Sequence, residues 1–125
     1  MVIVHDNTIQ SYEVDFEANT LAFKTLDYVH KKTDVIFSGY LAHVFYDEMK
    51  GSIILDVEEY SLDYFLMAGS ALVKERECSG WPIFYKTENE LMEFFQANEY
   101  KVFEISSSYG LNGWIFAKQM SLVSL

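Results

Sequence analysis

Three carboxylates at the end of one alternating segment come closest, in type and spacing, to residues that could do chemistry. Asp56, Glu58 and Glu59 follow the apolar residues Ile53 and Leu55. In an extended chain, residues two apart project from the same face, so Asp56 and Glu58 are expected side by side. Paired carboxylates divide acid and base roles only where their surroundings separate their pKa values. Acidic residues before a helix start are ordinary capping and dipole chemistry, so we expect no catalytic residue here.

Two histidines are the candidates for a metal site. His5 stands beside Asp6, and His43 precedes two further carboxylates, a donor set that zinc accepts when a fold gathers it. However, the sequence contains no His-x-x-x-His or Glu-x-x-His pair. We therefore expect no bound metal and no cofactor, with a small metal-dependent hydrolase using His5, His43 and Asp56 as the alternative.

Two features suggest a nucleophile without completing a motif. Residues 106–110 read Ser-Ser-Ser-Tyr-Gly, but neither a Gly-x-Ser-x-Gly elbow nor a phosphate-binding loop surrounds them. Hydroxyl groups before a turn commonly bond to their own backbone, which favours a structural role, with partner contact as the rival. The single cysteine, Cys78, excludes an internal disulfide, indicates a reducing compartment and is expected to act as a small apolar residue.

The elements that must position these residues are mostly strands. Apolar residues at period two are typical of half-buried strands, and Asn19 and the Gly110–Gly113 segment are the expected hairpin turns. In the strongest strand, Ile53, Leu55 and Val57 alternate with acidic residues. Strands are predicted over residues 8–16, 20–26, 33–40, 52–58, 100–106 and 114–123. Residues 41–49 are ambiguous, because they fit a helical face but Gly39 and Gly51 leave room for only two turns.

Two helices are expected between the fourth and fifth of these strands. Ser61 is the expected N-cap before apolar residues that recur at helical spacing as far as Val73. Thr87 and Glu90 have the spacing of a capping box, and that helix is expected to end near Asn98. The order predicts an α+β fold in a single domain, residues 1–125. We expect a mostly antiparallel sheet of about six strands with two helices packed on one face.

The charge of the chain restricts its partners. Nineteen acidic residues stand against nine basic ones, a formal net charge of −10. Such a surface repels nucleic acid and anionic membranes and attracts basic proteins. No apolar run approaches the roughly 20 residues that span a bilayer, and no signal-peptide core is recognisable at the start, so a cytoplasmic protein is expected.

The acidic residues are concentrated in two tracts, residues 47–63 and 88–104. Interface hot spots combine aromatic anchors with a charged rim, so loop aromatics beside these tracts are candidate contacts. The expected partner-binding residues are Asp56, Glu58, Glu59, Trp81, Glu104 and Tyr109, with Tyr46 and Tyr60 as further candidate anchors.

Three segments also carry a resemblance. They are His5-Asp6, the stretch from Gly51 to Glu59, and the stretch from Ser106 to Trp114. With them the chain resembles a family of small acidic bacterial proteins, some of which are similar to immunity proteins of toxin systems. The resemblance implies a binding role and a cytoplasmic location, and it carries over no site residue.

The function expected from these observations is non-enzymatic. An acidic binding protein would neutralise a basic partner, such as a toxin with nuclease activity. Charge would speed the encounter, and buried aromatic residues would slow release. The alternatives are the small hydrolase described above and a homo-oligomeric structural or regulatory protein, such as a homodimer.

Overall fold

The strands form one eight-stranded, antiparallel sheet in a computed structural model that describes residues 4–76 and 80–125. Their order across the sheet is β4-β7-β6-β5-β1-β2-β3-β8. The strands are β1 (Thr8–Asp15), β2 (Thr20–Leu26), β3 (Lys32–Ser38), β4 (Ala42–Tyr46), β5 (Ile53–Tyr60), β6 (Lys101–Tyr109), β7 (Asn112–Ala117) and β8 (Gln119–Ser124). The helices are α1 (Leu62–Ala68), α2 (Ser70–Arg76) and α3 (Glu88–Ala97).

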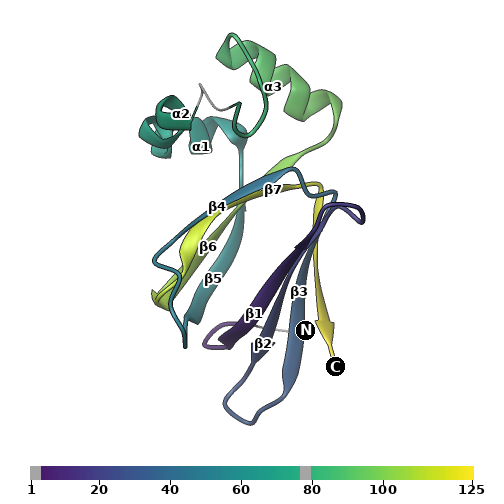
Figure 1. Cartoon of the computed structure of the whole chain (residues 1–125), viewed down its shortest axis with the longest axis vertical. Coiled ribbons are helices and arrows are strands. Elements are labelled where there is room, and N and C mark those ends of the chain that lie inside the picture. The colour runs from purple at the N-terminus through teal and green to yellow at the C-terminus, as the bar shows by residue number, and fades with distance from the viewer. Residues whose placement is uncertain (1–3, 77–79) are drawn as a thin grey trace.

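The sheet bends into two layers that face each other (Figure 1). One layer, here called the helix-side layer, contains β4, β5, β6 and β7, and its outward surface, the helix face, carries the helices. The other, here called the outer layer, contains β1, β2, β3 and β8. Corners between β3 and β4 and between β7 and β8 join the layers on one side. On the other side, β1 and β5 share a single register pair, Thr8 opposite Ile53.

Both surfaces of the helix-side layer carry buried residues, so the molecule has two cores. Alternate residues of β7 supply both of them. The inner core lies between the layers and includes Leu21, Phe23, Phe37, Ile54, Ile105 and Ile115. The helix core lies between the helices and the sheet and includes Phe65, Leu91, Phe95, Trp114 and Phe116.

The α+β class and the antiparallel sheet are confirmed, but the expected number of about six strands is wrong. Residues 41–49 contain β4, in which Ala42 and Val44 face the helix core and Phe45 packs on the inner core. The expected strand over residues 114–123 is divided at Lys118 into β7 and β8. At this corner, a Cβ on Gly39 would lie 2.7 Å from Cγ of Lys118, so the glycine makes room for the lysine stem.

The expected number of helices is also wrong, because the helix that starts after Ser61 is divided at Gly69 into α1 and α2. Both expected N-caps are confirmed. The Oγ atom of Ser61 accepts from the backbone N–H of Tyr64 at 3.2 Å, and Oγ1 of Thr87 accepts from that of Glu90 at 3.2 Å. In the described ranges, no helix is both long and apolar enough to cross a membrane.

Two turns were expected from their sequences. Asn19 closes the β1–β2 hairpin with a positive φ of 56°, as predicted. The β6–β7 turn is shorter than predicted, because Asn112 and Gly113 belong to β7 and only Gly110 and Leu111 lie between the strands. Gly110 adopts the positive φ, at 87°.

Candidate functional site

Irregular register in β5 decides which of its side chains reach the helix face. The pairing of β5 with β6 shifts on both sides of Ile54, a bulge that reverses the facing of later side chains. The predicted alternation, with Leu55 inward, is wrong as a result. Ile54 is fully buried in the inner core, whereas Leu55 is 46% exposed.

Beyond the bulge, alternation resumes and brings acidic residues of two strands together. Asp56 lies opposite Ser106 of β6, and Glu58 lies opposite Glu104. These side chains share the helix face with Tyr60, in the part that the helices leave uncovered. They surround a hollow of about 490 Å³, here called the acidic hollow. Its lining residues are His5, Leu55, Asp56, Glu58, Tyr60, Glu104 and Ser106.

The carboxylates in the acidic hollow repel one another. Partial burial raises the pKa of Glu104 above its ordinary value, and the negative charge of Glu58 raises it further. The hydroxyl of Tyr60 donates to Oε2 of Glu58 at 2.7 Å, and this bond is the main cause that raises the pKa of Tyr60 to about 12. Among the residues that the structure describes, no lysine or arginine lines the hollow. Its chemistry therefore suits a cation.

Aromatic rings continue from the acidic hollow toward the helices. Tyr60 stacks on Tyr64 of α1, with ring centroids 4.3 Å apart and planes 18° apart. Both rings contact Trp114, which is nearly buried and lies opposite Glu104 in the β6–β7 pair. Tyr64 stays 37% exposed. A cationic side chain bound by the carboxylates would therefore meet aromatic rings beside them.

The structure separates the other expected partner-binding residues from this hollow. Glu59 lies on the opposite face of β5, where its Oε1 is 3.7 Å from Nζ of Lys101. Tyr109 is 48% exposed at the far end of β6, beside Ile53.

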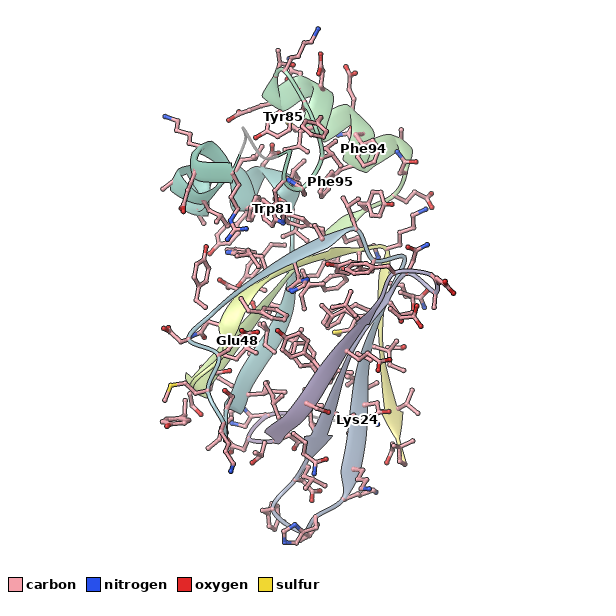
Figure 2. The ribbon with its side chains drawn as sticks, viewed as in Figure 1. Lys24, Glu48, Trp81, Tyr85, Phe94 and Phe95 are labelled. Carbon is pink, nitrogen blue, oxygen red and sulfur yellow. The ribbon has the colours of Figure 1, made fainter. Side chains whose placement is uncertain are left out.

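Trp81 packs into the helix core (Figure 2). Its ring contacts Phe65 and Phe116, its Nε1–H donates to the carbonyl of His43 at 3.3 Å, and the Arg76 guanidinium lies 5.6 Å from its ring centroid. Trp81 is therefore placed to hold the segment before α3 against the sheet.

The two histidines lie in different surroundings. His5 lines the acidic hollow, where its Nδ1–H donates to the carbonyl of Leu55 at 2.6 Å. His43 faces the other way, with Nδ1 2.7 Å from the hydroxyl of Tyr40, and burial lowers its pKa. Within residues 4–76 and 80–125, no three His, Cys, Asp or Glu side chains are grouped closely enough to hold a metal ion. Cys78 lies outside the described residues.

The serine tract is held by its own hairpin. The hydroxyl of Ser107 donates to the carbonyl of Leu111, and the Ser107 N–H donates to Oδ1 of Asn112 at 2.8 Å. The hydroxyl of Ser108 points toward the carbonyl of Ile53 at 3.4 Å. These bonds give Ser107 and Ser108 a structural role, whereas Ser106 lines the acidic hollow.

Sequence reasoning named Tyr60 as a candidate anchor but did not place it beside Glu58, and it missed Ser106 as part of the wall of the hollow. The place of Tyr60 could have been found, because it lies two residues beyond Glu58 in the same strand. The position of Ser106 depends on the register between β5 and β6, which no local pattern reveals. No protein-family model, curated protein or solved structure matches this chain.

Proposed function

We propose that this chain is a non-enzymatic binding protein whose acidic hollow takes a basic side chain of a protein partner. In that role it would neutralise the partner, as an immunity protein neutralises a cognate toxin such as a nuclease. The observation that carries the proposal is the convergence of Asp56, Glu58 and Glu104 around one hollow with no lysine or arginine in its described lining.

Electrostatics supports a cationic ligand. Glu58 of β5 and Glu104 of β6 lie opposite each other on neighbouring strands. Like charges in such a cross-strand pair destabilise the folded chain. An arginine or lysine between them would remove this repulsion and gain charge-assisted hydrogen bonds. Tyr60 and Tyr64 would add cation–π contact on the side toward the helices.

The charge of the whole molecule would act before contact. A net charge of −10 steers a basic protein during diffusion, and association of this kind can reach about 10⁸ M⁻¹s⁻¹ at low salt. At about 0.1 M ionic strength the screening length is about 10 Å, so the rate should fall as salt is added.

The test compares three immobilised proteins in capture from the lysate of the host, with elution by a salt gradient. The wild type is compared with E58Q/E104Q, which removes two charges from the acidic hollow. The matched control, E13Q/E93Q, removes two charges from exposed positions in β1 and α3. We expect the wild type and the control to capture the same basic protein and release it with salt, and E58Q/E104Q to lose it. The proposal is contradicted if all three proteins capture equally, or if the salt gradient does not release the captured protein.

A further inference from the structure

The last strand of the sheet presents a free edge. β8 pairs with β3 on one side and ends the strand order, so no described strand lies on its other side. The pairing runs through six consecutive residues, from Gln119 to Ser124, without a register shift. Figure 1 shows β8 at the margin of the outer layer, away from the helices.

The register identifies the backbone groups that point away from the sheet. The N–H of Leu125 donates to the carbonyl of Lys32 at 3.0 Å, which makes that pair a hydrogen-bonded one. In an antiparallel ladder, hydrogen-bonded and non-hydrogen-bonded pairs alternate. The N–H and C=O groups of Met120, Leu122 and Ser124 therefore point outward, each residue offering one donor and one acceptor.

The β8 edge has none of the features by which proteins prevent a sheet edge from pairing with another strand. Proteins protect edges with charged side chains, proline, bulges or very short strands. Residues 119–125 contain no charged residue and no proline, and the strand is regular. β4, at the opposite end of the strand order, is shorter and is followed directly by Asp47 and Glu48.

We propose that the β8 edge pairs with the β8 edge of a second copy of this chain, related by a two-fold axis at Leu122. Met120 of each copy would then lie opposite Ser124 of the other, and all outward donors and acceptors of the three residues would be matched. A two-fold contact needs a surface complementary to itself, and an antiparallel strand edge meets that requirement.

Because residues 119–125 contain no charged side chain, the edge offers a charged partner no ion pair. Two molecules of net charge −10 repel each other, and contact costs least where neither surface is charged. Val123, which is 39% exposed, would be covered by the neighbouring strand. The contact does not involve the acidic hollow, so this inference is independent of the proposed function.

The experiment is sedimentation equilibrium of the full chain over a range of concentrations. We expect the wild type to reach the mass of a dimer. V123K, which places a charge on the pairing strand, should weaken dimerisation at least tenfold. The control V29K, at a residue 62% exposed in the β2–β3 loop, should dimerise like the wild type. Circular dichroism establishes that each variant is folded.

Amide hydrogen exchange provides the second readout in the wild type. The N–H groups of Met120, Leu122 and Ser124 should be protected at high concentration and exchange rapidly at low concentration. Those of Ser121 and Val123, which face β3, should be protected at both. A monomer at every concentration, a dimer that V123K leaves intact, or rapid exchange of the three outward amides in the dimer overturns the proposal.

Discussion

Glu104 is the residue at which the repulsion within the acidic hollow is concentrated. Its pKa is raised above the ordinary value of 4.5 by burial and by the charge of Glu58. The folded chain therefore holds the proton of Glu104 more tightly than the unfolded chain does. The free energy of unfolding falls as pH rises from below 4.5 through the raised pKa of the folded chain. E104Q should be more stable than the wild type at pH 7, by about 0.5 kcal/mol, the scale of a cross-strand pair.

The advantage of E104Q should disappear as pH falls well below 4.5, because Glu104 is then protonated in both the folded and the unfolded chain. Urea denaturation at a series of pH values measures this. The control is E13Q, which removes one charge from an exposed position of β1 and leaves Glu58 and Glu104 in place. A pH-independent difference between E104Q and the wild type would show that charge is not the cause.

Two glycines allow crowding to be distinguished from backbone strain. A Cβ on Gly113 would lie 2.0 Å from the carbonyl oxygen of Val44 in β4, a backbone atom that cannot turn aside. A Cβ on Gly51 would meet nothing within 4 Å, but φ there is +82°. We expect G113A to cost about 3 kcal/mol or more of unfolding free energy, and G51A about 1–2 kcal/mol. Urea midpoints measure both costs, and the reverse order would contradict the crowding at β4.

At the scale of elements, one side-chain contact reinforces the weakly paired junction between the layers. Tyr12 of β1 donates its hydroxyl to Oε1 of Glu48, in the β4–β5 loop, and its ring packs on Phe45. Y12F removes only the hydrogen bond and should lower the free energy of unfolding by about 1 kcal/mol at pH 7. Y28F, at a residue 93% exposed, is the control and should change nothing.

The same contact predicts the behaviour of the chain at high pH. Burial and the bond to Glu48 raise the pKa of Tyr12 from 10.0 to about 12. The stability that this bond contributes is fully present below pH 10 and is lost as pH rises toward 12. In that range the hydroxyl of Tyr12 ionises readily in the unfolded chain only. Y12F should lose less stability than the wild type over that range in denaturation at each pH. An unchanged loss would place its cause elsewhere, for example at Tyr60.

The elements also show where sequence reasoning succeeds and fails. The β2 strand was predicted with its observed bounds, because its alternation matches one buried face. The pattern over β4 did not distinguish helix from strand, because a short apolar run fits both periods. The division at Lys118 depends on contact with Gly39, which is distant in sequence. Asp56 and Glu58 were predicted to share a face, but the position of Glu104 opposite Glu58 follows only from the register.

At the scale of the whole molecule, the helix-side layer belongs to both cores, so neither core exists without it. Leu21 is fully buried in the inner core, and Leu91 is fully buried in the helix core. Because β7 supplies residues to both cores, loss of either core removes the packing on one surface of β7. The helices are therefore expected to unfold together with the outer layer in one transition.

Two substitutions and two probes test this coupling. L21A and L91A should each cost about 2–5 kcal/mol of unfolding free energy. Fluorescence of Trp81 and Trp114, both in the helix core, reports on that core, whereas far-ultraviolet circular dichroism reports on all elements. The two curves should coincide for the wild type and both variants, because β7 transmits the loss of either core to the other. If this account is right, L91A should not separate the two curves. If L91A moves the fluorescence curve to lower urea and does not move the dichroism curve, the helices unfold as a separate unit, and the shared strand does not couple the cores.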